Sequence, residues 1–240
     1  MNTILFDLDG TLLPLDTEKF IQGYFMYLAK KLSGHINPKE LSNHVWNSTK
    51  YMVKNLDSNK TNKEAFFEDF QTRVENDINT IYPILDDFYK NDFTILKNLT
   101  NPTVLSAKII NILKEKGYDL VIATNPMFPK DAIYHRVEWA GLNVDDFKLI
   151  TTYENMHYCK PNLEYYKEIL STIDKKGNEV MMVGNDVQED IIAAKLGIKT
   201  FLINDLKIDR NEGSITPDYE GSLEEFYDFA LNLPVRGHME

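Results

Sequence analysis

Cysteine is almost absent from this chain of 240 residues, in which Cys159 stands alone. A single thiol cannot form an internal disulfide, which agrees with a reducing compartment. Long apolar runs are missing too, since no stretch approaches the roughly 20 residues that a bilayer-spanning helix needs. The opening residues, MNTILFDLDG, lack the basic flank and long apolar core of a secretory signal. We therefore expect a soluble, cytoplasmic protein with no membrane partner.

Positive charge is scarce relative to negative charge. The sequence has 26 Lys and Arg against 37 Asp and Glu, which gives a formal net charge of −11. Nucleic acids are held mainly by clustered Lys and Arg, and the sequence contains no such cluster. A small anionic substrate stays compatible with this charge, because one lysine, one cation and backbone N–H groups can dominate the field inside a cleft. We expect a small-molecule partner and no nucleic acid.

Two kinds of periodicity divide the chain. Residues 16–98 read as helices without a convincing strand, and after residue 99 strand-like and helical stretches alternate. The helical runs in the first part lie around residues 41–53, 64–78 and 82–96, after one that begins near Asp16; the strand-like stretches are 3–6, 118–123, 147–150, 179–183 and 199–203, and the later helical stretches are 104–116, 130–139, 163–173, 188–196 and 223–231.

This alternation predicts an α/β fold, a Rossmann-like parallel sheet with helices on both faces. Residues 1–15 and 99–240 would form the core domain, and residues 16–98 an inserted all-helical cap domain. Ligands of such sheets bind at the carboxyl ends of the strands, so polar residues at those ends are the first candidates for a site.

The sequence DLDGT at residues 7–11 follows the first predicted strand. Alternation along an extended chain puts Asp7 and Asp9 on one side. Two carboxylates so close raise one pKa strongly or require a metal ion. The simpler alternative is an acidic turn, because Asp-Gly is a common turn dipeptide.

Polar residues also end the second predicted strand and precede a later helix. Thr124 and Asn125 follow a β-rich run, and a hydroxyl there can donate to a phosphate oxygen, although such residues are more often caps or turn formers. Lys160 stands just before Pro161 and supplies a point charge suited to phosphate. Taken alone, Lys160 would be a solvated surface lysine.

The sequence GNDVQED at residues 184–190 follows another apolar strand. If a helix begins early there, Asp186 and Asp190 share a face, being four residues apart. Acids at a helix N-terminus are usually stabilised by its dipole, which would explain Glu189 without a functional role. Acids from two strand ends, a hydroxyl from a third and a lysine from a loop together favour a site where Mg²⁺ holds a phosphate between oxygen ligands.

These four segments, in this order, resemble the four motifs of the haloacid dehalogenase-like superfamily, and DLDGT is their most specific part. The resemblance implies that Asp7 is a nucleophile that forms an aspartyl-phosphate and that Asp9 is the general acid and base. It implies that Thr124 and Asn125 hold the phosphoryl group and that Lys160 joins nucleophile and phosphate. Residues 16–98 look like that superfamily's cap, which covers the site and selects small substrates.

The resemblance also implies a Mg²⁺ cofactor, for which the candidate ligands are Asp7, Asp9, Asn185, Asp186 and Asp190. The fourth motif usually has an acid directly after its glycine, whereas this chain has Asn185 there and Asp186 next. Either residue could be the ligand. We favour Asp186 from the sequence, because a carboxylate binds Mg²⁺ better than an amide does.

The predicted activity is a Mg-dependent phosphatase, a phosphoric monoester hydrolase acting on a small phosphorylated metabolite as a monomer or homodimer. The superfamily's dehalogenases lack the second aspartate, so Asp9 favours phosphoryl chemistry. A phosphosugar mutase of the same superfamily and a non-catalytic phosphate-binding protein of the same fold are the alternatives. Lys19, Phe20 and Tyr24, early in the insertion, are candidates for substrate selection, although Phe20 and Tyr24 have the spacing of core residues.

Overall fold

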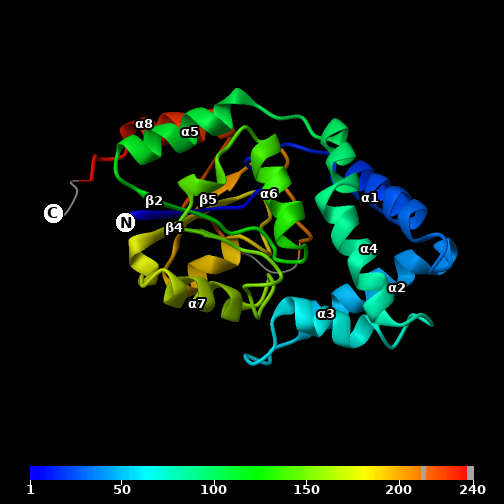
Figure 1. Cartoon of the computed structure of the whole chain (residues 1–240). Coiled ribbons are helices and arrows are strands. Elements are labelled where there is room, and N and C mark those ends of the chain that lie inside the picture. The colour runs from blue at the N-terminus through cyan, green and yellow to red at the C-terminus, as the bar shows by residue number, and fades with distance from the viewer. Residues whose placement is uncertain (212–214, 237–240) are drawn as a thin grey trace.

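A parallel β-sheet with helices on both faces forms one part of the molecule, and a group of helices lies beyond one end of it (Figure 1). The computed structural model describes residues 1–211 and 215–236. The sheet order is β3-β2-β1-β4-β5-β6, and every pairing is parallel. The strands are β1 (Thr3–Phe6), β2 (Asp119–Ile122), β3 (Leu149–Ile150), β4 (Val180–Gly184), β5 (Lys199–Ile203) and β6 (Tyr219–Gly221).

The central strand β1 is buried on both faces, as expected for a strand inside a parallel sheet. Its side chains alternate between two apolar clusters: Ile4 and Phe6 pack with α5 (Val104–Glu115), α6 (Lys130–Trp139) and α8 (Leu223–Asn232). Leu5 faces the other side, toward α7 (Leu163–Thr172). Because successive side chains of a strand point to opposite faces, this one short strand contacts both layers of helices.

The strand order reverses between β1 and β4, which are direct neighbours with Phe6 opposite Val183. In open α/β sheets the crevice at such a reversal, outside the carboxyl ends of the strands, is the usual place for a ligand. Asp7 and Asn185 are the first residues beyond β1 and β4. The topology thus brings the first and fourth polar segments together.

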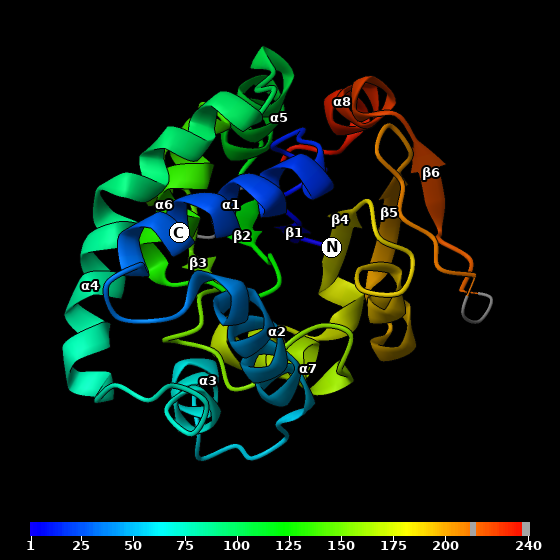
Figure 2. The ribbon, with the colours of Figure 1, turned by 90° about the vertical axis from the view of Figure 1, so that its right-hand side faces the viewer.

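Residues 17–99 form an insertion of helices and connecting turns, and the two ends of this insertion lie side by side. Leu15 and Thr100 form an antiparallel bridge, and the Asn101 amide donates to the Pro14 carbonyl at 2.8 Å. The insertion contains α1 (Thr17–Leu32), α2 (Pro38–Lys54), α3 (Asn62–Phe70), α4 (Ile78–Lys90) and the 3-10 segment η1 (Asp92–Leu99). In Figure 2, α1 passes in front of β2 and α2 lies in front of α7, so the insertion covers part of that side of the sheet.

The predicted fold class is confirmed, and several helix boundaries are corrected. The helix predicted at 64–78 ends at Phe70, and a new helix begins after Asp77, whose side chain caps it by accepting from the Asn79 amide. The stretch at 82–96 is divided between α4 and η1. The three-residue edge strand β6 was not predicted, since two of its residues are exposed and it has no alternating pattern. The division into a core domain and a cap domain of residues 16–98 stays a prediction.

The helix predicted at 188–196 is also wrong at its start. The segment 186–190 is a turn, and only the 3-10 segment η4 (Ile191–Leu196) follows it; two further 3-10 turns are η2 (Val144–Asp146) and η3 (Gly177–Glu179). The Asp186 carboxylate accepts from the amides of Gln188 and Glu189, and Asp190 accepts from the Asp186 amide. Side-chain acceptors compete here with helical backbone bonds.

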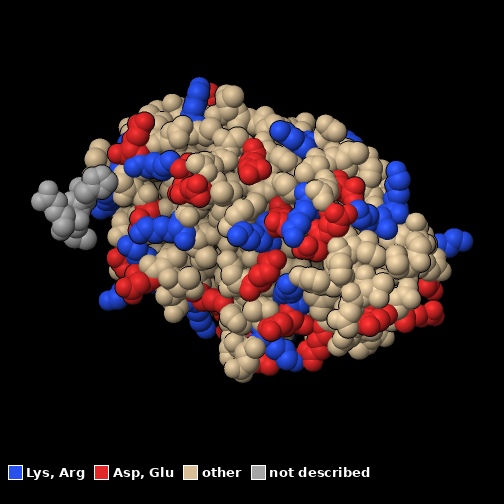
Figure 3. All heavy atoms as spheres, viewed as in Figure 1, with Lys and Arg blue, Asp and Glu red and all other residues tan. Residues whose placement is uncertain are grey.

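The face shown in Figure 3 carries acidic and basic side chains interspersed over both parts of the molecule. Within the described part of the chain, no helix has both the length and the apolar character needed to cross a bilayer.

Candidate active site

Asp7 occupies the position directly after β1, and the fold holds it from the backbone. Its amide donates to the Val183 carbonyl at 2.9 Å. Its side chain accepts from Nζ of Lys160, which lies 2.9 Å from Oδ1. Burial raises the pKa of Asp7 to about 6, against the lowering effect of the Lys160 charge. Asp7 is a nearly buried carboxylate whose only ion-pair partner in the described chain is one ammonium.

Lys160 is fully buried and is shared by two carboxylates. Its Nζ lies 2.6 Å from Oδ1 of Asp190, which is 1% exposed. Burial lowers the pKa of Lys160, but the charges of Asp190 and Asp7 outweigh it and raise the pKa above its ordinary value. Burial likewise raises the pKa of Asp190 to about 7. The second Asp190 oxygen accepts from the Asp186 amide at 2.9 Å, so both of its oxygens are engaged within the chain.

Asp9 lines the same cavity above the strand ends as Asp7, but its ion-pair partner is different. Its Oδ2 accepts from the guanidinium of Arg136 on α6. Its Oδ1 is buried and accepts no hydrogen bond from the described residues. Burial raises the pKa of Asp9, and the Arg136 charge opposes that shift. The Arg136 guanidinium lies 4.7 Å over the ring of Phe128, and its buried Nη2 is also unpaired within the described chain.

Asn185 and Asp186 point to different neighbours. Asn185 lies against the acidic turn, where its Oδ1 accepts from the Thr11 hydroxyl at 3.1 Å and its Nδ2 donates to the Leu206 carbonyl at 2.6 Å. A Cβ at Gly10 would meet Nδ2 of Asn185 at 2.5 Å, so only glycine allows this approach. Asp186 instead turns to Nη1 of Arg210, at 2.7 Å, and to the two amides that it caps.

Thr124 and Asn125 both line the cavity, as their predicted roles require. The Asn125 side chain is also structural: Oδ1 accepts from the Lys160 amide at 3.2 Å, and Nδ2 donates to Glu189 at 3.0 Å. Asn125 therefore ties the loop that carries Lys160 to the turn that carries Glu189. Burial raises the pKa of Glu189, which also lines this cavity. From the sequence alone, Glu189 was expected only to stabilise a helix N-terminus.

The cavity above the strand ends, which we call the strand-end cavity, lies between the sheet and the insertion and encloses about 480 Å³. The core contributes Asp7, Asp9 and Arg136, while α1 and α2 contribute side chains such as Phe20 and Lys50. Of the specificity candidates, Phe20 lines this cavity. Lys19 is exposed and pairs with Asp16 at 3.0 Å, and it lines neither this cavity nor the apolar one described below.

The donor set suits a hard cation better than a soft one. The cavity carries an unpaired buried Asp9 oxygen and carboxylates whose pKa values are raised, so the buried negative charge exceeds what Lys160 and Arg136 neutralise. Within the described residues, no three Asp, Glu, His or Cys side chains are gathered as a ready-made metal site. Mg²⁺ fits such a site, because it keeps several waters and needs only one or two carboxylates.

Arg136 and Arg210 were not predicted from the sequence as residues of the site. A signal existed for Arg136, since it lies on the apolar face of α6 with Ala132, Ile133 and Val137, where a charge needs a buried partner. No comparable signal marks Arg210, which reaches Asp186 from a loop after β5.

Comparisons with known proteins identify the family and the fold of the chain. The sequence profile of a family described as haloacid dehalogenase-like hydrolase matches residues 4–203. A pyrophosphatase, PpaX, of Halalkalibacterium halodurans is 25% identical over 205 residues, which cover 85% of this chain and 83% of that protein.

Two solved structures share the fold. The structure of a HAD phosphatase from Thermococcus onnurineus is similar with a TM-score of 0.59 and 21% identity, covering 98% of this chain and 100% of that one. The structure of an L-2-haloacid dehalogenase from Xanthobacter autotrophicus is similar with a TM-score of 0.57 and 14% identity, covering 97% of this chain and 99% of that one. Since both phosphatase and dehalogenase folds match, the overall likeness does not choose between the two reactions.

Proposed function

The chain belongs to the haloacid dehalogenase-like hydrolase family, and on that premise we propose that it is a phosphatase, which hydrolyses a small phosphorylated metabolite through an aspartyl-phosphate on Asp7. The observation that carries the proposal is that Asp7 and Asp9 line one cavity while Lys160 Nζ lies 2.9 Å from Asp7. A halide leaves without a proton, so a dehalogenase has no use for a second acid. Asp9 therefore favours phosphoryl transfer over dehalogenation.

In the first half-reaction, a carboxylate oxygen of Asp7 attacks phosphorus and the bond from phosphorus to the leaving oxygen breaks. Asp9 donates its proton to that oxygen, which departs as an alcohol. The raised pKa of Asp9 supports this role, because burial keeps a proton on the carboxyl group at higher pH than in water. Lys160 supplies positive charge beside the attacking oxygen and reduces its repulsion from the phosphoryl group.

In the second half-reaction, water attacks the phosphorus of the aspartyl-phosphate and Asp9 accepts a proton from it. The bond between phosphorus and the Asp7 oxygen breaks, which releases phosphate and restores the carboxylate. Thr124 and Asn125 are proposed to hold the phosphoryl oxygens, and their place in the cavity supports this. One group thus serves as acid and then as base.

We propose Mg²⁺ as the cofactor, held by Asp7 and Asn185 together with water, while the carboxyl group of Asp9 stays free for proton transfer, because a carboxylate that binds a metal ion cannot hold the proton that it donates. When bound, it would neutralise charge on the phosphoryl oxygens and on the carboxylates around them. The sequence favoured Asp186 over Asn185, but the contacts favour Asn185, since it lies on the acidic turn whereas the Asp186 carboxylate caps its own turn and pairs with Arg210. Asp190 is proposed to position Lys160 rather than to bind the metal directly.

Phosphate release from an artificial aryl phosphate tests the proposal. We expect release from the aryl phosphate to depend on added Mg²⁺ and to be lost on chelation. With alkyl phosphates as substrates, we expect Asp9→Asn to abolish release. Asp218→Asn is the matched control, because Asp218 pairs with Lys199 and lies outside the strand-end cavity. No release from aryl phosphates or from a panel of phosphorylated metabolites, with folded protein and excess Mg²⁺, would contradict the phosphatase assignment.

A further inference from the structure

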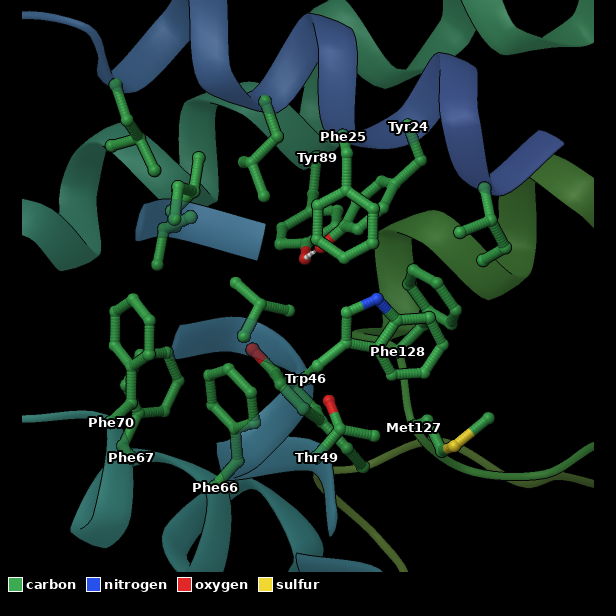
Figure 4. A pocket seen from close by; sticks show the side chains of 17 residues that line it. Tyr24, Phe25, Trp46, Thr49, Phe66, Phe67, Phe70, Tyr89, Met127 and Phe128 are labelled. Atoms are coloured by element: carbon green, nitrogen blue, oxygen red, sulfur yellow. Dashed lines mark hydrogen bonds between the residues drawn. The ribbon is translucent and has the colours of Figure 1, made fainter. Parts of the chain in front are cut away.

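A second cavity lies inside the insertion, beside the strand-end cavity, and its walls are aromatic. We call it the aromatic chamber. Figure 4 shows side chains from four helices and a core loop around one space: Tyr24 and Phe25 come from α1, Trp46 from α2, and Phe66 from α3. Phe128 of the core closes the side nearest the sheet. No residue that lines the chamber is charged.

The aromatic chamber is larger than a packing defect. Its free volume is about 70 Å³, several times the ~10–15 Å³ that one water molecule needs. Two buried hydroxyls in its wall, of Tyr24 and Tyr89, bond to each other at 2.7 Å. Because these two hydroxyls bond to each other, an apolar group that enters the chamber displaces little water from polar atoms. The free-energy cost of desolvation is therefore small.

The aromatic chamber and the strand-end cavity are neighbours that share part of their walls. Five residues line both: Ile21, Trp46, Thr49, Met127 and Phe128. Phe128 lines both spaces, and the guanidinium of Arg136, the partner of Asp9, lies 4.7 Å from the centroid of its ring. The chamber therefore lies next to the space in which a leaving group would extend from a phosphoryl group bound at Asp7.

We propose that the aromatic chamber receives the leaving group of the substrate, and that this substrate is a phosphate monoester of an alcohol with an apolar or aromatic group. The inference rests on the proposed phosphatase function and names its substrate class. Inorganic pyrophosphate is disfavoured as the substrate, because its second phosphoryl group would place charge beside a chamber that has no charged wall residue. Apolar groups in place of that phosphoryl group would be stabilised by burial.

A series of alkyl phosphates tests the proposal, because ethyl, butyl and 2-phenylethyl phosphates have leaving alkoxides of similar basicity. Differences in kcat/KM then report contacts of the leaving group rather than its reactivity. We expect kcat/KM to rise roughly fourfold for each added methylene that enters the chamber, which is roughly sixteenfold from ethyl to butyl. The 2-phenylethyl ester should be better still, and pyrophosphate should be poorer than butyl phosphate.

Two substitutions on α2 form a matched pair. Trp46 and Tyr51 are each 43% exposed, but only Trp46 lines the chamber. Trp46→Ala should lower kcat/KM for 2-phenylethyl phosphate roughly fivefold relative to ethyl phosphate, by removal of an aromatic wall. Tyr51→Ala should leave the ratio of the two unchanged.

Binding of the corresponding non-hydrolysable phosphonates, measured by calorimetry in the presence of Mg²⁺, separates this inference from the phosphatase proposal. We expect affinity to increase with apolar chain length, together with a negative heat-capacity change. Equal affinity of propyl and 3-phenylpropyl phosphonates, or equal kcat/KM along the ester series, would overturn the inference. Chain-length-dependent phosphonate binding without hydrolysis of any ester would support the chamber while overturning the phosphatase function.

Discussion

Nζ of Lys160 lies 2.6 Å from Oδ1 of Asp190, and both groups are almost completely buried. A buried ion pair contributes mainly through placement, since desolvation offsets much of its attraction. Asp190 thus fixes the ammonium at the point where it also reaches Asp7, 2.9 Å away. The Lys160 ammonium is therefore held in place beside Asp7 by its two carboxylate partners.

Replacement of this carboxylate should affect rate more than metal affinity. We expect Asp190→Asn to lower kcat by roughly 10- to 100-fold, as is usual when a supporting partner is lost. The Mg²⁺ concentration for half-maximal activity should stay within about threefold of wild type, because Asp190 acts through Lys160. Full recovery of kcat at high Mg²⁺ would show instead that Asp190 is a direct metal ligand.

Arg136 should be required for stability as well as for activity. We expect Arg136→Met to lower the free energy of unfolding by about 3 kcal/mol, the lower end of the range for buried pairs, because it leaves the Asp9 carboxylate, whose side chain is 28% exposed, without its partner. The double variant Asp9→Asn with Arg136→Met should be more stable than Arg136→Met alone. Urea unfolding of wild type, Asp9→Asn, Arg136→Met and the double variant measures both quantities, and additive effects of the two substitutions would show that the pair does not interact.

The sequence predicted the sheet and the place of the site because those features follow from local patterns. The strand at residues 3–6 and the helix at 130–139 were predicted at their observed boundaries, since continuous apolar and helical periodicities mark them. The start predicted for the helix at 188 was wrong, because the Asp186 and Asp190 side chains take backbone amides that a helix would use.

Partner choice within the site depends on contacts between distant segments. The pairing of Asp9 with Arg136 joins residues 127 positions apart, and that of Asp186 with Arg210 depends on a loop after β5. Spacing along the chain carries no information on such contacts. The same holds for Lys160, whose burial no local pattern distinguishes from a solvated lysine.

Magnesium titration distinguishes the two candidate ligands after β4. We expect Asn185→Ala to raise the Mg²⁺ concentration for half-maximal activity by about tenfold or more, and Asp186→Asn to change it by less than about threefold. Thr11→Val is the control, because it removes the 3.1 Å hydrogen bond to Asn185 without removing the amide oxygen. The opposite order of the two variants would support Asp186, the ligand favoured by the sequence alone.

In protein freed of divalent cations, stability should fall as pH rises from about 4 to 7. Burial raises the pKa values of Asp7 and Asp190 to about 6 and about 7, so the folded protein holds protons that the unfolded chain has already released. Unfolding then releases protons, and its free energy decreases with rising pH until both folded groups have ionised. Mg²⁺ should reduce this fall. The difference between wild type and Asp190→Asn, followed by thermal unfolding across this range, isolates the effect, and identical profiles for the two proteins would contradict it.

The most direct test of the account is to trap the phosphoryl group on Asp7. Wild-type protein mixed with an alkyl phosphate and Mg²⁺, quenched in acid during turnover and digested, should give a peptide containing residues 7–11 that carries one added phosphoryl group. Borohydride reduction should convert the modified aspartate at position 7 to homoserine, and Asp7→Asn should give neither product while remaining folded. Phosphate release by a correctly folded Asp7→Asn protein at a rate near that of wild type, or a phosphoryl group found only on another residue, would contradict nucleophilic attack by Asp7.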